Sequence, residues 1–335
     1  MDYRNLGRSG LRVSPLCLGT MNFGGPTDEA TAGRIIARAK EAGVNFIDTA
    51  DAYTGGKSEE IVGRAIRADR DAWVLATKVA NPIQPDANGG GTSRKWIMRA
   101  AEASLRRLGT DYIDVYYLHK EDHATPLEET VRAMGDLVRD GKVRYFGVSN
   151  YRAWRVAEIC AWCDRVGLAR PVVSQPYYHA LNRVAELEQL PACAFYGLGV
   201  FSYSPLGRGI LTGKYDPAAP PPADTRAGRH DRRMLQTEWQ PHSLRLAQEI
   251  AAHAAAAGVS PEAFAVRWVL NNRLVTGIVA GPRTEAQWES YLAALQAPFT
   301  AADEAFVTER VPAGHHAVPG YNDPAYPIEG RQPLT

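Results

Sequence analysis

The chain has 335 residues, a formal net charge of +1 and a hydrophobic fraction of 45%, as is typical of a globular protein with a sizeable core. The near-zero net charge argues against nucleic acid or a membrane surface as a partner, and no apolar run reaches the roughly 20 residues that span a bilayer. The first four residues lack the apolar stretch of a secretory signal, and four cysteines do not make a disulfide framework. We therefore expect a cytoplasmic protein.

The chain begins with a hairpin pattern and continues with a strand–helix repeat. The segment YRNLGRSGLRVS alternates in polarity around Ser9-Gly10, which predicts a short β-hairpin. Eight short apolar runs follow, and after each comes a longer segment with apolar residues three and four positions apart. In chain order the runs lie within SPLCLGT, VNFIDTA, WVLATKV, YIDVYYLH, VRYFGVS, PVVSQPYY, LGVFSYSPL and LVTGIVAGP.

Near-continuous apolar strands joined by helices predict a parallel sheet covered by helices. Eight such units in one chain predict an α/β fold, a closed (β/α)₈ TIM barrel, which we place in a single domain over residues 1–335. A doubly wound open sheet is the alternative. It would carry a GxGxxG turn after the first strand, and LGTMNFGG has the wrong spacing.

Glycine and proline mark the ends of helices and the loops. Several helical segments end at glycine, as at Gly43, Gly109, Gly141 and Gly167, which is typical of a left-handed C-cap. Pro-rich and Gly-rich composition predicts a mobile flap at 216–228, a flexible loop at 88–91 and an irregular cover from Pro312 onward.

Titratable side chains follow three neighbouring strands. Strand two ends in Asp48 and continues to Tyr53, strand three ends in Lys78, and strand four ends in His119. In a (β/α)₈ barrel the C-terminal strand ends form the active site. A nearby ammonium lowers the pKa of a tyrosine from its ordinary value of about 10. We therefore predict a proton-donating Tyr53, tuned by Lys78 and Asp48, with His119 orienting a carbonyl oxygen.

Two other pairs invite a metal or redox interpretation. Cys160 and Cys163 have CxxC spacing but fall on the apolar side of a predicted helix, which favours a buried structural role. His123 lies four residues after His119, yet the segment follows a strand and no HExxH sequence is present. We therefore expect no metal site.

The later strands carry groups suited to a planar amide and to an anion. Ser149, Asn150 and Gln175 lie at strand ends and suit an amide ligand, and Tyr203 offers an aromatic face. Arg283 stands at the start of the last helix of the repeat, where a helix N-terminus and a guanidinium together bind anions. (β/α)₈ barrels often bind phosphate after strands seven and eight.

Taken together, these motifs resemble the aldo-keto reductase superfamily over nearly the whole chain. The matching stretches are LGTMNFGG, FIDTADAYTGGKSEEIVGRAI, VLATKV, LRRLGTDYIDVYYLH, GKVRYFGVSN, FSYSPLGRGILTGKY and AGPRTEAQ. The resemblance implies a (β/α)₈ barrel that reduces carbonyls with a nicotinamide cofactor, usually NADPH (NADP⁺ after reaction) and less often NADH. The family's catalytic tetrad falls on Asp48, Tyr53, Lys78 and His119.

The resemblance also implies a set of cofactor contacts. Ser149, Asn150 and Gln175 match the nicotinamide-amide contacts, Tyr203 the stacking aromatic, and residues 204–214 the pyrophosphate loop. The full set is Gly19, Thr20, Met21, Asp48, Ser149, Asn150, Gln175, Tyr203, Ser204, Pro205, Leu206, Gly207, Arg208, Gly209, Lys214, Gly281, Arg283, Gln287 and Tyr291.

One departure concerns the adenosine end of that set. The family usually has an acidic residue and an asparagine about one helical turn beyond Gln287, where this chain has Ser290 and Tyr291. The preference for NADPH therefore depends mainly on Arg283, which matches a position near the 2′-phosphate, while Tyr291 offers a ring that could stack on the adenine.

The stretches KVANPIQPDANGG, YLHKEDHATPLEETV and PGYNDPAYPIEGR resemble a bacterial branch of the family. Some of its members reduce a ketone on trichothecene mycotoxin intermediates, so the resemblance implies a bulky, oxygen-rich ketone such as a 3-keto trichothecene, and a detoxification role. Trp96, Tyr178 and Trp239 are candidates for lining the substrate pocket or for plain packing. We expect a small-molecule carbonyl as the partner, and a monomer or weak homo-oligomer.

Two other functions stay open at this point. Lys78 at a strand end suits a Schiff-base aldolase built on the same barrel. The fold also serves, in some relatives, as a non-catalytic, cofactor-sensing subunit of channels or other assemblies.

Overall fold

The computed structural model describes residues 1–327, and the chain forms two compact units. The barrel unit comprises Met1–Tyr177, Glu188–Tyr203 and Asn272–Leu292. The second unit comprises Tyr178–Leu187, Ser204–Asn271 and the chain from Ala293 onward. Compactness alone does not decide whether the two units fold together, so the single domain expected over residues 1–335 stays a prediction.

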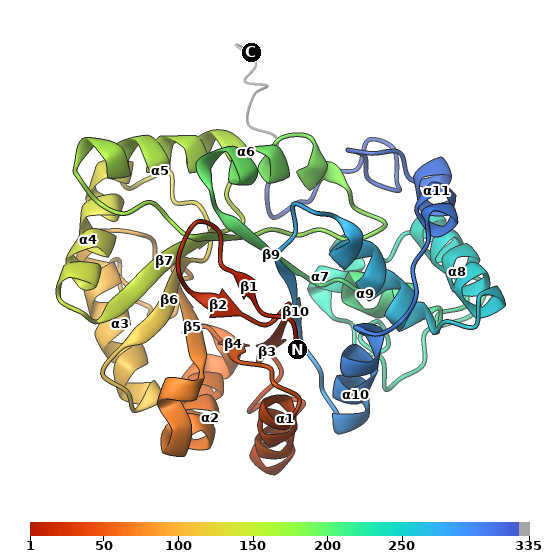
Figure 1. Cartoon of the computed structure of the whole chain (residues 1–335), viewed down its shortest axis with the longest axis horizontal. Helices are drawn as coiled ribbons and strands as arrows, with labels where there is room; N and C mark the ends of the chain where they lie inside the picture. The colour runs from red at the N-terminus through yellow and green to blue at the C-terminus, as the bar shows by residue number, and fades with distance from the viewer. Residues whose placement is uncertain (328–335) are drawn as a thin grey trace. The chain divides into compact units, whose positions relative to one another are not determined.

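Eight parallel strands close into a barrel, as the sequence predicts (Figure 1). The strands are β3 (Leu16–Gly19), β4 (Phe46–Asp48), β5 (Val74–Val79), β6 (Ile113–Leu118), β7 (Val143–Ser149), β8 (Val173–Gln175), β9 (Gly199–Tyr203) and β10 (Gly277–Ala280). Each strand pairs with the next in chain order, and β10 pairs with both β9 and β3. The fold is therefore a (β/α)₈ TIM barrel, and the doubly wound sheet is excluded.

Helices connect the strands within the barrel unit and lie around its outside (Figure 1). They are α1 (Glu29–Glu41), η1 (Tyr53–Gly56), α2 (Lys57–Ile66), η2 (Arg67–Ala72), α3 (Arg94–Leu108), α4 (Leu127–Arg139), α5 (Ala153–Arg165), α6 (Gln189–Tyr196) and α10 (Glu285–Ala294), whose last two residues belong to the second unit. The glycines expected at helix ends adopt positive φ, for example 62° at Gly109. A residue with a Cβ adopts this conformation only at a cost.

The N-terminal hairpin covers one end of the barrel. Strands β1 (Arg4–Asn5) and β2 (Arg12–Val13) pair in antiparallel fashion, and the Arg8 amide donates to the carbonyl of Gly197, just before β9, at 2.9 Å. Leu6 of the hairpin is fully buried. Because it packs at the N-terminal strand ends, the hairpin leaves the opposite, C-terminal ends for a site.

The barrel interior is a packed apolar core. Its members are Leu6, Val13, Cys17, Phe46, Val74, Ala76, Val115, Tyr117, Val173, Phe201 and Val279. Phe46 and Phe201 meet edge to face with ring centroids 4.9 Å apart, an arrangement that stabilises aromatic pairs beyond simple burial. This core fixes the strand register, and through it the positions of the residues that follow the strands.

The second unit contains helices that the strand–helix pattern only partly predicts. They are η3 (Val184–Glu186), η4 (Gly207–Thr212), α7 (Arg232–Gln236), α8 (Pro241–Ala256), α9 (Pro261–Asn271) and α11 (Ala301–Arg310). The sequence predicts α8 but neither α9 nor α11. In α9, residues 263–266 and 268–270 are all buried. A helix covered on most sides lacks the amphipathic periodicity that reveals one in sequence.

Two of the predicted irregular segments lie in the second unit. Residues 216–228 contain turns but no helix or strand. The segment after Pro312 is tied down by backbone hydrogen bonds, from Arg183 N to His315 O at 2.9 Å and from Ala317 N to Leu181 O at 2.8 Å. The cover expected from Pro312 onward includes residues 328–335, which lie outside the described residues.

The four cysteines are free and buried. Burial raises the pKa of both Cys160 and Cys163 to about 12, which suppresses the thiolate that redox and metal chemistry need. A structural role is thus favoured for both. Within residues 1–327, no helix combines the length and the apolarity required to cross a bilayer.

Helix α2 approaches α3 at a glycine, and this close packing can be tested. A Cβ at Gly63 would overlap the carbonyl oxygen of Leu108, so Gly63→Ala should destabilise the protein by about 1–3 kcal/mol in urea unfolding. The control is Gly33→Ala in α1, where a Cβ meets no atom within 4 Å and a gain of about 0.5–1 kcal/mol is expected. Equal effects of the two substitutions would contradict this account of the packing.

Candidate active site

A buried ion pair stands at the C-terminal ends of two neighbouring strands. Asp48 ends β4 and pairs in register with Ala76 of β5, so Lys78, two residues further on, lies on the same inward side of the sheet. The Asp48 and Lys78 side chains are 1% and 0% exposed, and the Lys78 ammonium contacts Asp48 Oδ1. Buried charges of this kind need partners for all their hydrogen-bonding groups.

Lys78 places its three ammonium protons on three acceptors. Its Nζ donates to Asp48 Oδ1, to the carbonyl of Thr49 at 2.8 Å and to Tyr53 Oη at 3.1 Å. A lysine ammonium has three donors and no acceptor, so this set uses all of them. Because Tyr53 Oη accepts a hydrogen bond from Lys78, the phenol's own proton points to another acceptor.

Burial and charge act on this group in opposite directions. Burial by itself would lower the pKa of Lys78, but Asp48 and Tyr53 outweigh it and the net pKa is raised, so the ammonium stays charged. Burial raises the pKa of Tyr53, and Lys78 offsets part of that rise. The sequence predicts the effect of Lys78 correctly but not the net direction, because it did not include the cost of burying a phenolate.

His119 completes the group. Its ring meets that of Tyr53 edge to face, with centroids 5.9 Å apart. Burial, Lys78 and Lys120 hold the pKa of His119 well below its usual value, so the imidazole is neutral. The amide nitrogen of Asn81 lies 2.9 Å from His119 Nδ1. If that amide donates, the single ring proton lies on Nε2.

Four predicted nicotinamide contacts form a network beside this group. Gln175 Nε2 donates to Asp48 Oδ2 at 3.0 Å, and Ser149 Oγ donates to Gln175 O at 2.8 Å. Asn150, at a positive φ of 57°, donates to His119 O at 2.8 Å and accepts from Tyr203 Oη at 2.8 Å. The amide side chains and the tetrad thus constrain one another.

Other predicted cofactor residues follow β3 and β10. Thr20 follows Gly19, the last residue of β3, and its Oγ1 donates to Asp48 O at 3.0 Å. The next residue, Met21, is 40% exposed. Gly281 accepts from Asn22 at 3.2 Å, and the amide of Arg283 donates to Gln287 Oε1 at 2.8 Å.

The two departures from the family pattern lie further along α10. Tyr291 is 9% exposed, so its ring offers little open face to a ligand. Ser290 Oγ donates to Ala286 O at 3.1 Å on the exposed side of the same helix. The burial of Tyr291 and the hydrogen bond of Ser290 within the helix therefore do not favour contacts of either side chain with adenine.

The predicted pyrophosphate segment, Ser204–Lys214, belongs to the second unit. Positive φ angles recur along it: 56° at Ser204, 51° at Gly207, 53° at Arg208 and 100° at Gly209. Runs of this kind turn backbone N–H groups into anion-binding nests. A Cβ at Gly209 would lie 3.4 Å from Lys214 Nζ, so the lysine ammonium lies over the backbone of the loop. Pro205 is buried and Leu206 half-buried within it.

Sequence reasoning missed several residues of these sites. Asn81 follows the third strand closely enough that the strand-end rule could have found it. Arg226, in the segment expected to be mobile, pairs with Asp231 just beyond that segment at 3.0 Å, and burial together with Arg208 lowers the pKa of Arg226. Trp96 and Tyr178, considered for the substrate pocket, are 2% and 1% exposed, which favours packing.

Within the described part of the chain, no group of three or more His, Cys, Asp or Glu side chains could hold a metal ion. His123 instead lies 3.3 Å from Glu121.

A barrel with titratable groups gathered at the C-terminal ends of its strands is typical of the (β/α)₈ enzymes. Residues 15–309 match the Aldo/keto reductase family. The chain therefore belongs to this family, and it is an oxidoreductase that uses a nicotinamide cofactor to interconvert carbonyls and alcohols.

Three relatives illustrate the range of the family. The uncharacterized oxidoreductase YrpG of Bacillus subtilis (strain 168) is 40% identical over 312 residues, 88% of this chain and 91% of that protein. A probable voltage-gated potassium channel subunit beta of Arabidopsis thaliana is 37% identical over 300 residues, 88% and 91% of the two chains. Its counterpart in Oryza sativa subsp. japonica is 39% identical over 293 residues, 86% and 89%.

Asp51 gives this region a pH dependence that can be measured. Burial, with the neighbouring Glu59, raises the pKa of Asp51 to about 7, whereas an unfolded aspartate titrates near 3.9. The folded state holds the Asp51 proton more tightly than the unfolded state does. The free energy of unfolding is therefore highest, as far as Asp51 determines it, below about pH 4, and it decreases as the pH rises toward 7. Stability should fall across this window by at most about 1.4 kcal/mol per pH unit.

The variant Asp51→Asn cannot ionise, so its unfolding free energy relative to wild type should rise between about pH 4 and 7 and level off above that. Urea unfolding of both proteins at several pH values measures this. A difference that does not change with pH would contradict a raised pKa of Asp51.

Proposed function

We propose that the protein reduces an aldehyde or ketone to an alcohol with NADPH as the hydride donor, and that Tyr53 supplies the proton. The observation that carries this proposal is the arrangement around Lys78. Its ammonium is bonded at once to Asp48, to the Thr49 carbonyl and to Tyr53 Oη. That arrangement leaves the phenol proton for a substrate oxygen.

Tyr53 acts as the general acid. Its raised pKa keeps the phenol protonated at neutral pH, and Lys78 stabilises the phenolate that forms when the proton leaves. Asp48 keeps the ammonium in place and charged. A positioned acid of this kind contributes roughly 10²–10⁴-fold to a rate.

His119 orients the substrate. As a neutral imidazole whose Nδ1 faces Asn81, it offers an Nε2–H donor to the carbonyl oxygen. A neutral donor leaves the proton transfer itself to Tyr53, and the bond it makes fixes the angle at which the oxygen meets the phenol.

The residues present fit a nicotinamide cofactor, which when bound would supply the hydride. Ser149, Asn150 and Gln175 carry the hydroxyl and amide groups that match a carboxamide, and Tyr203 supplies an aromatic face. In the second unit, the positive-φ run at 204–209 with Lys214 over Gly209 suits a pyrophosphate.

We base the proposed preference for NADPH over NADH on Arg283 and Gln287. The backbone amide of Arg283 donates a hydrogen bond to the side chain of Gln287 at the start of α10. A guanidinium at a helix N-terminus favours a doubly charged 2′-phosphate. Measuring kcat/KM with NADPH and with NADH tests this preference, and equal values for the two cofactors would contradict it.

The substrate is proposed only by resemblance: a bulky, oxygen-rich ketone such as a 3-keto trichothecene, with detoxification as the role. A panel that sets fused-ring ketones against small aldehydes would test this, and a clear preference for small aldehydes would count against it. The cytoplasmic location and the monomer or weak homo-oligomer stay predictions of the sequence.

A second candidate is a nicotinamide-binding subunit of a larger assembly. Two of the relatives described above carry the name of a probable potassium channel subunit beta. The complete proton-donating group argues for the enzyme. A purified chain that binds NADPH but oxidises none of it with a panel of aldehydes and ketones would favour the subunit.

The Schiff-base alternative is poorly supported. Lys78 is fully buried and its pKa is raised, whereas a nucleophilic lysine needs a lowered pKa and an open approach. Borohydride trapping of a substrate adduct on Lys78 would reverse this judgement.

Tyr53→Phe tests the proton donor. The variant keeps the ring but loses the phenol, so kcat should fall about 10²–10⁴-fold, while the Kd for NADPH, measured by fluorescence quenching, stays close to wild type. Turnover close to that of wild type, with the cofactor bound, would show that Tyr53 is not the proton donor.

Tyr112→Phe is the matched control. Tyr112 lies elsewhere in the barrel unit and donates to Asp71 at the surface, at 2.7 Å. Removing its hydroxyl should leave both kcat and the Kd for NADPH unchanged, so a loss of turnover seen in both variants would point to a general effect of removing a phenol.

A further inference from the structure

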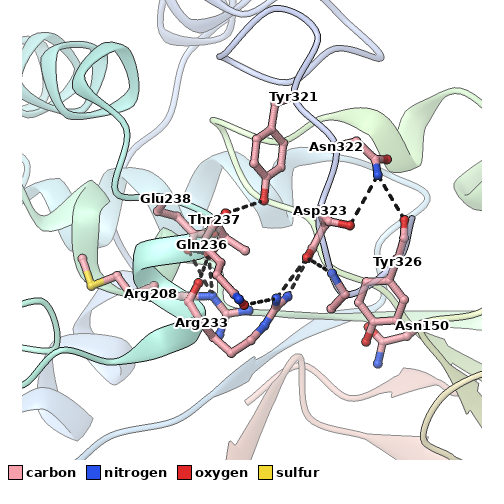
Figure 2. Close-up of polar contacts among 12 residues, drawn as sticks. Asn150, Arg208, Arg233, Gln236, Thr237, Glu238, Tyr321, Asn322, Asp323 and Tyr326 are labelled. Atoms are coloured by element: carbon pink, nitrogen blue, oxygen red, sulfur yellow. Dashed lines mark hydrogen bonds and ion pairs between the residues drawn. The ribbon is translucent and has the colours of Figure 1, made fainter. Parts of the chain in front are cut away.

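Within the second unit, a buried carboxylate lies against the predicted pyrophosphate loop. Glu238 lies two residues after the end of α7, and its side chain is 2% exposed. Its Oε2 lies 3.0 Å from Arg208 Nε, and the same Nε donates to Thr237 Oγ1 at 3.1 Å. Figure 2 shows Arg208 against Thr237 and Glu238. The guanidinium is therefore held at its Nε edge by two neighbouring residues.

A histidine supports the same loop. His179 is fully buried, and its Nε2 lies 3.6 Å from Glu238 Oε1. A Cβ at Gly207 would lie 3.4 Å from His179 Cε1, so the imidazole packs under the turn that precedes Arg208. Burial, His316 and Arg208 hold the pKa of His179 well below its usual value, so the ring is neutral and adds no charge beside Arg208.

The segment that carries Glu238 is itself fixed. Arg233 of α7 makes a two-pronged pair with Asp323, at 3.0 and 2.6 Å, and Tyr321 Oη donates to Gln236 O at 3.1 Å. Both contacts are drawn in Figure 2. Since both contacts involve α7, the two residues that follow this helix have little freedom to move.

Arg208 needs such support for a conformational reason. It has a positive φ of 53°, between Gly207 and Gly209, which are also left-handed. A residue with a long side chain is strained in this region, and an arginine loses much rotamer freedom when it is held in one place. A side chain ordered before the ligand arrives binds it at a lower entropic cost.

We propose that Glu238 is a positioning residue for cofactor binding: it holds Arg208, through its Nε, in the orientation in which the guanidinium and the 204–214 loop bind the pyrophosphate of a dinucleotide. This inference rests on the proposed function, because it takes the loop to be the pyrophosphate site. Glu238 acts through Arg208 and does not itself touch the cofactor.

The protonation of Glu238 suits this role. Burial raises its pKa well above the usual range, and Asp323 adds to the rise. Charged or neutral, the carboxyl keeps an oxygen 3.0 Å from Arg208 Nε, and a neutral carboxyl does not compete with a phosphate for the positive charge. Glutamine at this position should therefore replace most of its action.

A double-mutant cycle tests the proposal, with the Kd for NADPH of the full chain measured by calorimetry. Glu238→Ala and Arg208→Ala should each weaken binding about tenfold or more, a change that corresponds to about 1.4 kcal/mol. Because Glu238 acts through Arg208, the double variant should bind like Arg208→Ala alone. Glu238→Gln should recover most of the affinity, and kcat at saturating NADPH should change little in Glu238→Ala.

Glu249→Ala is the matched control. It removes a carboxylate that pairs with Arg310 at 2.9 Å in the same unit, and its Kd should equal that of wild type. Should Glu238→Ala lack a cooperative unfolding transition, Glu238→Met replaces it, because methionine keeps the length of the side chain but offers no oxygen to Arg208 Nε; an unchanged Kd in that variant overturns the proposal.

The remaining outcomes distinguish a failure of the positioning role of Glu238 from a failure of the proposed function. If Arg208→Ala weakens binding while Glu238→Ala does not, or if the two losses add in the double variant, the positioning role is wrong and the proposed function stands. If the wild-type chain shows no calorimetric binding of NADPH, the proposed function fails, and this inference fails with it.

Discussion

The chemistry proposed for this protein depends on a buried ammonium. Lys78 is taken fully out of water, and each of its three donors is matched, to Asp48, to a backbone carbonyl and to Tyr53. Removing one partner of such a pair leaves a lone buried charge, a loss of about 3–5 kcal/mol. The barrel provides the rigid frame that makes this arrangement possible, because strand register places Asp48 and Lys78 on one side of neighbouring strands. In the proposed reaction, Tyr53 is then a phenol that stays protonated until a substrate takes its proton.

The fold was predictable because its signals are local and repeated. Strands such as VLATKV are buried at every position and read as continuous apolar runs, and glycines such as Gly109 end helices where only a left-handed residue fits. Helix α9 was missed for the opposite reason, since burial on most sides erases the periodicity that identifies a helix. The division into two units also escaped the sequence, because it depends on contacts between segments far apart in the chain.

The candidate site was predictable where position alone determines it. Asp48, Lys78 and His119 lie at or next to the C-terminal ends of β4, β5 and β6, so the barrel brings them together whatever surrounds them. The net pKa of Tyr53 was not predictable, because it is a balance between burial and charge that only coordinates supply. The roles proposed for Asn81 and Glu238 depend on single contacts between segments far apart in the chain, Asn81 with His119 and Glu238 with Arg208. No periodic pattern in the sequence encodes contacts of that kind.

The central claim is that Lys78 lowers the energy of the Tyr53 phenolate. The most direct measurement is the pKa of that phenol, followed by NMR in ring-labelled protein and assigned with a variant that lacks the hydroxyl, in wild type and in Lys78→Met. The account predicts that the pKa of Tyr53 is higher in Lys78→Met than in wild type, because burial then acts without the opposing charge. An unchanged or lower pKa in that variant would contradict the account.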